Sequence, residues 1–298
     1  MSALFQKILG RQKPHPEQNE ATLPLSQALS KAVPDQEQLS SSLEWDFATA
    51  QSVGRQRESN EDALFTFGSH LSFEEFQTFV GFFVVADGMG GHVNGEIASG
   101  LAVRTIAEQV VKKTFDYFLS NEPMPDTAGY TELLVNATQE ANQAIKKQVP
   151  GGGTTLTALL IIQGQLLLIH VGDSRAYLIT PDGAAHQLTH DHSFVRQLVD
   201  SGQLSPEEAS VHPQRNILSM ALGQLEPLEP EIVTQPIPEK GHILICSDGL
   251  WGVLSEINIV HIIQSTDDLS KACHKLIEAA NQAGGPDNIT AILIRTPN

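Results

Sequence analysis

The sequence predicts an α+β fold in which amphipathic helices cover antiparallel β-sheets. Three observations lead to this class. Apolar runs of strand length recur along the chain, tight turn signals join some of them, and three other segments repeat their apolar residues with a helical period. Strands joined by tight turns favour antiparallel pairing, and long amphipathic helices must then cover the sheets to bury their apolar faces.

A flexible leader is expected before the folded part. Residues 1–44 contain six glutamines and four prolines, and they have almost no aromatic side chains after Phe5. A segment of this composition cannot bury enough apolar surface to offset the entropy lost on folding. We therefore expect a leader over residues 1–44 and one folded domain over residues 45–298.

Seven apolar runs predict the strands of this domain. They cover residues 64–67, 79–86, 156–162, 166–171, 176–179, 243–246 and 289–294. Residues 163–165 and 181–183 carry the glycine, proline and aspartate that are typical of hairpin turns.

Three further segments predict helices, because the apolar residues of each share one helical face. These faces are formed by Ala98, Leu101, Ala102, Ile106 and Val110, by Leu134, Ala137, Ala141 and Ile145, and by Leu269, Ala272, Cys273, Leu276 and Ala280.

The composition excludes several classes of protein. The 298 residues carry a formal net charge of −17, so nucleic acid, which is bound by clustered Lys and Arg, is not an expected partner. No apolar run approaches the roughly 18 residues of a membrane span, and the N-terminus lacks a signal-peptide pattern. Cys246 and Cys273 lack Cys-x-x-Cys spacing, which favours two reduced thiols in a cytoplasmic protein.

Four aspartates stand at the ends of predicted strands. Asp87 and Asp248 each follow an apolar run, whereas Asp62 and Asp287 each precede one. Three of the four lie beside glycines, which let the backbone come close to a ligand. Because strand ends in a layered fold can converge on one cleft, these residues predict a shared site.

The ordinary interpretation of a single Asp-Gly pair is a turn, and that of an acidic composition is solubility. Four aspartates at strand ends, in a chain whose other turns mostly lack Asp, favour a cation site instead. Oxygen ligands without cysteine or a regular histidine pattern indicate Mg²⁺ or Mn²⁺ rather than zinc. Two such ions about 3.5–4 Å apart can share a bridging carboxylate and lower the pKa of a bridging water.

Arg57, five residues before Asp62, is the candidate for binding a phosphate group. A guanidinium fork matches phosphate geometry better than a lysine does, and we expect Arg57 on the incoming strand. In isolation, a solvated surface arginine is an equal alternative. Covalent phosphatase mechanisms lack support, since no Gly-x-Ser-x-Gly elbow and no cysteine in a phosphate-loop context occur.

Eight motifs in order, spanning about residues 45–296, resemble the metal-dependent serine/threonine protein phosphatases of the 2C type, and their bacterial branch in particular. Each motif is weak alone, but eight in the same order are a specific signal. They are residues 54–62 (GRQRESNED), 85–92 (VADGMGGH), 153–155 (GTT), 171–177 (VGDSRAY), 188–193 (LTHDHS), 212–223 (HPQRN to LG), 247–251 (SDGLW) and 285–290 (GPDNIT).

The resemblance implies a four-layer sandwich of two stacked antiparallel β-sheets flanked by α-helices. It implies that Asp87 bridges two metal ions, that the carbonyl of Gly88 binds one, and that Asp248 and Asp287 bind the other. Asp173, in Gly-Asp-Ser-Arg, matches the residue that holds a weaker third ion in bacterial members.

By the same resemblance, Arg57 binds the substrate phosphate, and Glu61 and Asp62 orient metal-bound waters. Residues from about 191 to 212 would form a flap over the site and influence the choice of substrate. The flap candidates for substrate contact are Asp191, His192 and Ser193.

One departure from the family concerns the general acid. Many eukaryotic members have a histidine directly after the Asp-Gly pair, whereas this chain has Met89 there, and His92 follows three residues later. A metal-bound water is the first choice as the proton donor.

The sequence therefore predicts a phosphatase that hydrolyses phosphoserine and phosphothreonine with a metal-activated water and without a phosphoenzyme. Phosphoproteins and an opposing Ser/Thr kinase are the expected partners. The alternatives are a catalytically silent scaffold or sensor of the same fold, and a dedicated regulator acting on one partner in a stress or sigma-factor switch.

Overall fold

The computed structural model describes residues 45–73, 76–90, 93–120, 123–224, 227–238 and 240–297. The leader predicted over residues 1–44 lies outside the described residues.

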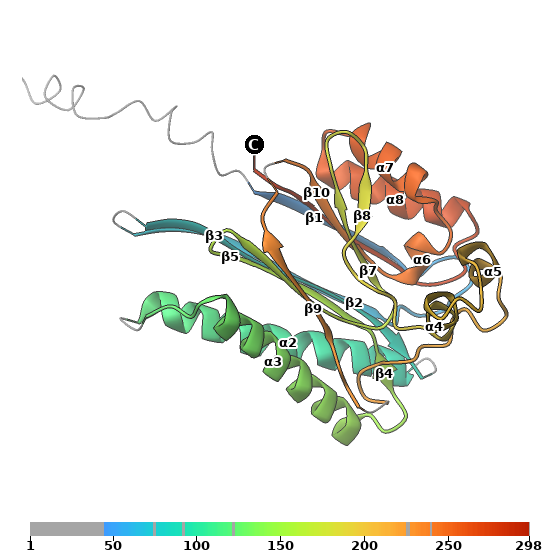
Figure 1. Ribbon diagram of the computed structural model, residues 1–298, viewed down its shortest axis with the longest axis horizontal. Coiled ribbons are helices and arrows are strands. Elements are labelled where there is room, and N and C mark those ends of the chain that lie inside the picture. Colours follow the sequence, from blue (N-terminus) through green and yellow to red (C-terminus); the bar gives the residue numbers. More distant parts are fainter. Residues whose placement is uncertain are drawn as a thin grey trace, which may run out of the picture. The chain divides into compact units, whose positions relative to one another are not determined.

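Two antiparallel sheets form the centre of the fold (Figure 1). The first sheet contains, in spatial order, β1 (Asp46–Ser52), β11 (Ile289–Arg295), β10 (His242–Cys246), β7 (Arg175–Ile179) and β8 (Ala185–Gln187). The second contains β2 (Asp62–Phe73), β3 (Phe76–Met89), β5 (Leu156–Ile162), β6 (Gln165–Val171) and β9 (Glu231–Pro236), with the short β4 (Gly153–Thr154) paired to β3.

Helices cover the outer face of each sheet, which gives the four layers that the resemblance implies (Figure 1). The second sheet is covered by α2 (Val93–Leu119) and α3 (Thr127–Gln148). The first is covered by α6 (Asp248–Trp251), α7 (Glu256–Gln264) and α8 (Leu269–Gln282). Two short helices, α4 (Phe194–Asp200) and α5 (Pro206–Ser210), lie in the connection between β8 and β9.

The side chains of the inner strands alternate between two apolar cores. In β3, Phe82 and Val84 point toward α2 and α3, while Phe83 and Val85 point toward the first sheet. This alternation follows from the two-residue period of a strand, and it explains why the run is apolar throughout. Both faces of the strand are buried, so the residues at its end are fixed with little freedom to move.

All seven predicted strands and all three predicted helices are present. The turn at residues 163–165 joins β5 and β6 as a two-residue hairpin, with Gln163 and Gly164 both at positive φ, as a type I′ turn requires. The edge strands β1 and β9, which have few large apolar residues, were not predicted, and neither were the very short β4 and β8 or the helices α4 to α7. Such elements carry too little periodicity to be recognised without their neighbours.

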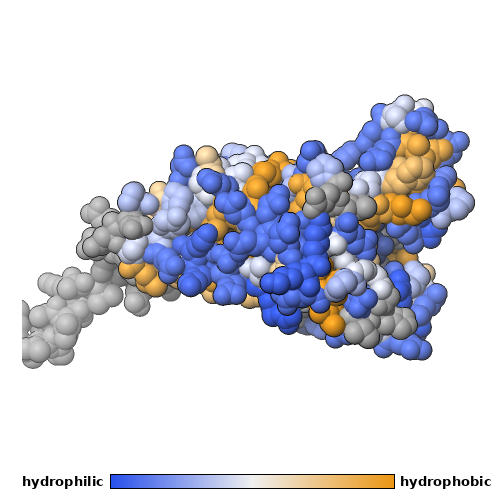
Figure 2. Space-filling model, turned by 90° about the horizontal axis from the view of Figure 1, so that it is seen from below, coloured by the Kyte–Doolittle hydropathy of each residue, from blue (hydrophilic) through white to orange (hydrophobic). Residues whose placement is uncertain are grey.

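The face that Figure 2 shows, which includes α2 and α3, is largely hydrophilic, and its hydrophobic residues lie in separate patches. Among the described residues, no helix combines the length and the apolar character needed to span a membrane.

Candidate metal centre

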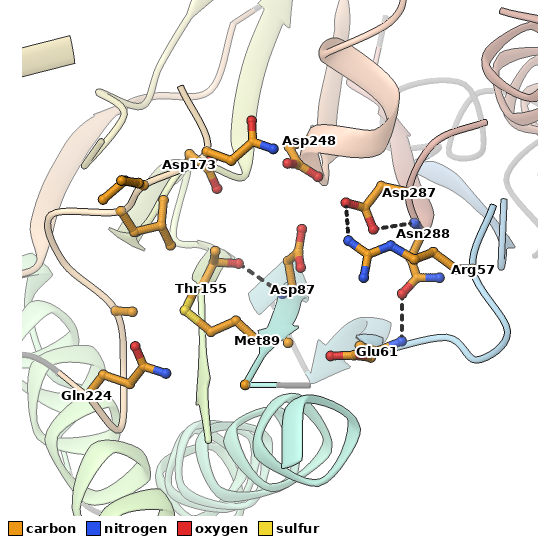
Figure 3. A pocket seen from close by; sticks show the side chains of 16 residues that line it. Arg57, Glu61, Asp87, Met89, Thr155, Asp173, Gln224, Asp248, Asp287 and Asn288 are labelled. Atoms are coloured by element: carbon orange, nitrogen blue, oxygen red, sulfur yellow. Dashed lines mark hydrogen bonds and ion pairs between the residues drawn. The ribbon is translucent and has the colours of Figure 1, made fainter. Parts of the chain in front are cut away.

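Acidic side chains from several elements line one cavity of about 420 Å³ at the ends of the two sheets (Figure 3). Asp87 comes from the end of β3, Asp248 from the start of α6, Asp287 from the loop before β11 and Asp173 from the turn after β6. Asp87, Asp248 and Asp287, which are three of the four aspartates predicted at strand ends, therefore line one cavity. Asp173 lines the same cavity.

The backbone of Asp87 is held on both sides by two threonines. Its N–H donates to Oγ1 of Thr155 at 2.9 Å, and its carbonyl accepts from the N–H of Thr155 and from Oγ1 of Thr154, each at 2.9 Å. The carboxylate is left to face the cavity (Figure 3). Burial raises the pKa of Asp87 well above its usual value, and the charges of Asp62 and Asp248 raise it further.

Burial and neighbouring negative charges also act on the carboxylates of Asp248 and Asp173. Burial, followed by the charge of Asp287, raises the pKa of Asp248 to about 6. Burial, followed by the charges of Asp248 and Asp191, raises the pKa of Asp173 well above its usual value. Oδ1 of Asp248 is buried and has no hydrogen-bond partner among the described residues. Several buried carboxylates with raised pKa values are a common feature of functional sites.

This donor set fits divalent cations. All donors are hard oxygens, they repel one another when charged, and a buried carboxylate oxygen of Asp248 lacks a partner within the described chain. Among the described residues, no three His, Cys, Asp or Glu side chains gather into a preformed metal cluster. Mg²⁺ usually keeps several waters and binds to only one or two carboxylates, so an open arrangement of this kind suits it better than a closed cage.

Arg57 extends over the cavity from the loop between β1 and β2, and the expectation that it lies on a strand is wrong. The loop carries Gly54 at a φ of 83°, which turns the chain away from β1. Nη2 of Arg57 donates to Oδ2 of Asp287 at 2.7 Å. Burial lowers the pKa of Arg57, but the hydrogen bond and charge of Asp287 outweigh this and raise it overall.

Glu61 and Asp62 are neighbours in sequence but occupy different positions at the site. Glu61 lines the cavity, whereas Asp62 does not. Oδ2 of Asp62 accepts from Oγ of Ser247 at 2.8 Å and from Oγ1 of Thr290 at 2.6 Å, and its Oδ1 is buried without a partner among the described residues. Burial raises the pKa of Asp62 to about 7.

Asn288 is a site residue whose role the sequence did not reveal. Its Oδ1 accepts from the N–H of Glu61, and its Nδ2 donates to the carbonyls of Val53 and Ser59, each at 2.8 Å. One amide thus ties the Arg57 loop to the strand that follows Asp287. The motif containing Asn288 is visible in the sequence, but nothing in the motif alone indicates this bracing contact.

Gly88 and Gly95 allow β3, Glu61 and α2 to approach closely. A Cβ at Gly88 would lie 2.3 Å from the carbonyl oxygen of Gly95, and a Cβ at Gly95 would lie 1.9 Å from Oε2 of Glu61. Met89 lines the cavity on the other side of Asp87 from Arg57 (Figure 3). His92 lies outside the described residues.

The three flap candidates have different surroundings. Asp191 is buried and accepts from Nε and Nη2 of Arg175, at 2.9 and 2.6 Å. Ser193 caps α4 by accepting from the N–H of Arg196. Nδ1 of His192 accepts from the N–H of Gly172 at 3.1 Å, and His192 lines neither the metal-centre cavity nor the cavity beside it.

Known proteins are similar to this chain in sequence. The profile of the protein phosphatase 2C family matches residues 51–293. The chain is 37% identical to protein phosphatase PhpP of Streptococcus pneumoniae over 242 residues, which cover 81% of this chain and 94% of the relative.

Solved structures are similar as well. A serine/threonine phosphatase of S. agalactiae has 30% sequence identity and a TM-score of 0.73, covering 85% of this chain and 100% of that one. The catalytic domain of PstP, solved in complex with two manganese ions, has 32% identity and a TM-score of 0.68, covering 85% of this chain and 99% of that one. The chain belongs to the protein phosphatase 2C family of metal-dependent serine/threonine phosphatases.

Proposed function

We propose that the protein hydrolyses phosphoserine and phosphothreonine in proteins at a binuclear Mg²⁺ or Mn²⁺ centre, without a phosphoenzyme. The observation that carries this proposal is the cavity in which Asp87, Asp173, Asp248 and Asp287 meet beside Arg57. Such a site combines oxygen donors for cations with a guanidinium for the phosphate, which is what direct hydrolysis of a phosphate ester needs.

In this proposal Asp87 would contribute to both ions, the carbonyl of Gly88 would help to hold one of them, and Asp248 and Asp287 would help to hold the other. Asp173 would hold a third, weaker ion. When bound, the two metal ions supply a water of lowered pKa as the nucleophile. Glu61 lines the cavity and would orient waters there. Asp62 does not line the cavity but accepts hydrogen bonds from Ser247 and Thr290, so it would act on metal-bound waters only indirectly.

Arg57 would hold the non-reacting oxygens of the phosphate. It is half-exposed at the cavity, and its position is fixed by Asp287. Met89 has no titratable proton, so the leaving alkoxide would take its proton from water rather than from this side chain.

The protein would act in signalling, opposing a Ser/Thr kinase, and would work in the cytoplasm. Cys246 and Cys273 are both buried and unpaired, which suits a reducing compartment. Residues 1–44 would form a leader to the phosphatase domain over 45–298. The intact acidic set favours an enzyme over a catalytically silent scaffold of the same fold.

Release of phosphate from a phosphothreonine peptide and from p-nitrophenyl phosphate, with Mn²⁺ present, tests the proposal. Asp87→Ala and Asp287→Ala should each abolish turnover, while circular dichroism shows an unchanged fold. The proposal is wrong if the wild-type protein releases no phosphate from either substrate, or if both variants keep their activity.

A further inference from the structure

A second cavity, of about 570 Å³, opens beside the metal centre. Both cavities are lined by Arg57, Asp173, Asn216, Asp248 and Asp287. The second cavity therefore adjoins the first at the residues that would surround the phosphate.

The walls of the second cavity come from the flap and from the segment after Asp248. Val195 and Val199 of α4 and Ala209 of α5 lie on the flap side. Trp251 and Val253 belong to the segment after Asp248. These five apolar side chains face a volume that falls within the range for small-ligand sites. An apolar group placed there would gain free energy by leaving water.

Three of the four arginines that line the cavity pair with carboxylates, at 2.7 Å for Arg57–Asp287, 2.6 Å for Arg175–Asp191 and 3.1 Å for Arg196–Asp200. The lining side chains without an ion pair among the described residues are the exposed Arg215 and, where the cavity adjoins the metal centre, Asp173 and Asp248. Away from the metal centre, Arg215 is thus the one unpaired charge on the described walls.

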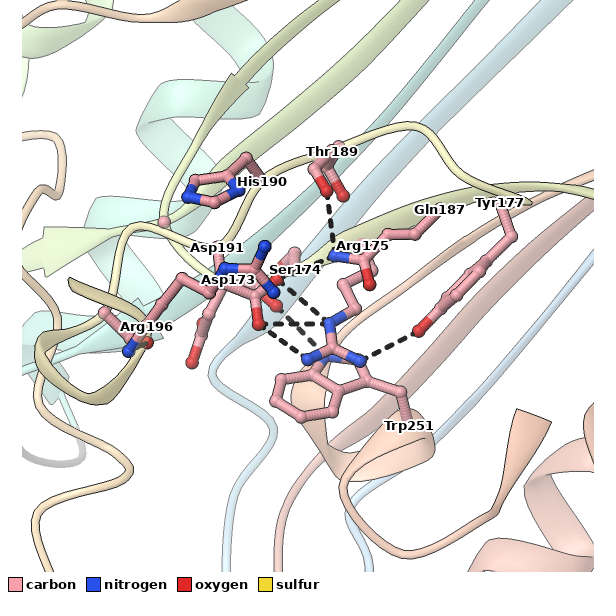
Figure 4. A network of polar contacts seen from close by, with 12 residues as sticks. Asp173, Ser174, Arg175, Tyr177, Gln187, Thr189, His190, Asp191, Arg196 and Trp251 are labelled. Carbon is pink, nitrogen blue, oxygen red and sulfur yellow. Dashed lines mark hydrogen bonds and ion pairs between the residues drawn. The ribbon is translucent and has the colours of Figure 1, made fainter. Parts of the chain in front are cut away.

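One wall of the cavity is hydrogen-bonded to the metal centre (Figure 4). The guanidinium of Arg175 lies 3.5 Å from the ring centroid of Trp251, and Nη1 of Arg175 donates to the Tyr177 hydroxyl at 3.0 Å. Nε1 of Trp251 donates to the carbonyl of Asp173 at 3.0 Å, and Asp173 also lines the metal cavity, so these contacts link this wall to the metal centre. A binding site built in advance loses little free energy to ordering.

We propose that this second cavity binds an apolar side chain of the substrate polypeptide, close in sequence to the phosphorylated residue. The inference rests on the proposed function, and it adds a preference for sequence around the phosphorylated site. Successive residues of an extended peptide are about 3.3 Å apart, so a side chain one to three positions away can reach a cavity that adjoins the phosphate. The occupant is thus a neighbouring residue of the same chain.

A leucine scan tests the proposal with wild-type protein. Phosphothreonine peptides would carry alanine at the three positions on each side, and leucine would replace each alanine in turn. Burying a leucine side chain is worth about 1.5 kcal/mol or more, so one position should show a kcat/KM at least about tenfold higher, mostly through a lower KM. Equal kcat/KM values at all six positions would overturn the inference. Turnover of p-nitrophenyl phosphate checks the proposed function separately, since that substrate has no neighbouring residue.

Substitutions in the second cavity then test whether this cavity produces the preference for leucine. Val199 belongs to the flap and Val253 to the segment after Asp248, and Val199→Asp and Val253→Asp should each reduce the ratio of kcat/KM between the preferred leucine peptide and its alanine counterpart to near one. Val211→Asp is the matched control, because Val211 is 76% exposed in the flap segment and lines neither cavity. Its ratio should equal that of the wild-type protein. An unchanged kcat/KM ratio in both cavity variants would show that the leucine binds outside this cavity, and it would refute the assignment.

Discussion

Nη2 of Arg57 lies 2.7 Å from Oδ2 of Asp287, although 230 residues separate the two in the chain. The contact joins the candidate phosphate-binding cation to a candidate metal ligand. It positions the guanidinium without burying it, since 42% of the Arg57 side chain stays exposed. Loss of either partner should therefore change the position of the other. Phosphate binding and metal binding are thus linked through one ion pair.

Arg57→Ala should lower kcat/KM for a phosphopeptide by about 10²-fold, because one charged donor to the phosphate is lost. Arg57→Lys should recover only part of this, since an ammonium cannot form the forked contact of a guanidinium. Steady-state kinetics with Mn²⁺ measure both. Arg55→Ala is the matched control: its Nε donates to the carbonyl of Asn281, and it does not line the cavity. Full activity in Arg57→Ala would rule out its assigned role.

Gly95→Ala should reduce both activity and stability. The new Cβ would lie 1.9 Å from Oε2 of the buried Glu61 and 3.0 Å from the backbone carbonyl carbon of Gly88, so Glu61 would leave its place in the cavity and β3 would be crowded against α2. Thermal unfolding and phosphate release measure the two effects. Gly100→Ala on the same helix would place a Cβ 3.9 Å from the Arg104 guanidinium, an ordinary van der Waals contact, and should stabilise the protein by up to about 1 kcal/mol with unchanged activity. Similar activity in the two variants would contradict the role of Glu61.

Gly54→Ala should destabilise the fold by about 3 kcal/mol. Gly54 has a φ of 83°, and a Cβ there would lie 2.1 Å from the carbonyl oxygen of Asp287, so left-handed strain and a backbone clash combine. Gly151 has the same φ, but a Cβ at that position would have no atom within 4 Å, so Gly151→Ala should cost only about 1–2 kcal/mol. Urea unfolding of both variants separates the clash from the strain. Equal losses of unfolding free energy in the two variants would mean that the loop around Asp287 moves to accommodate the new Cβ.

Divalent cations should bind more tightly as the pH rises from about 5.5 to about 7.5. Burial raises the pKa of Asp248 to about 6 and that of Asp62 to about 7, above their value in an unfolded chain. The folded protein without metal therefore holds protons that the unfolded chain has released, and its free energy of unfolding falls as the pH rises through this window.

A metal ion held by Asp248 must displace the proton of that carboxylate, and its charge also favours ionisation of the nearby Asp62, so each proton released should strengthen binding by about tenfold per pH unit below the raised pKa. The Mn²⁺-induced increase in melting temperature, measured across this range, checks the prediction. An increase that is the same at every pH would show that the carboxylates are already ionised in the protein without metal.

Much of the fold could be predicted from the sequence, because its central strands are buried on both faces and its long helices have one apolar face. Leu156–Ile162 is predicted with the bounds that the structure has. The edge strand Glu231–Pro236 alternates exposed and half-buried residues and ends in proline, so its identity depends on pairing with β6. No local pattern could have identified it.

The site was predictable to a similar extent. The strand-end positions of Asp87, Asp248 and Asp287 indicated that these side chains converge, and the family match agrees with the predicted family. The loop position of Arg57 and the bracing amide of Asn288 could not be predicted in this way. Both depend on contacts between segments more than 220 residues apart, which local periodicity does not encode.

The first and last strands of the described domain, β1 and β11, pair along their whole length, from Asp46 with Arg295 to Ser52 with Ile289. This pairing has a consequence during biosynthesis. Arg57 leaves the ribosome 230 residues before Asp287, so the nascent chain cannot assemble the cavity until Asp287 and Asn288 have emerged. A chain cut short before Asp287 would lack a candidate metal ligand and also the strand that pairs with β1.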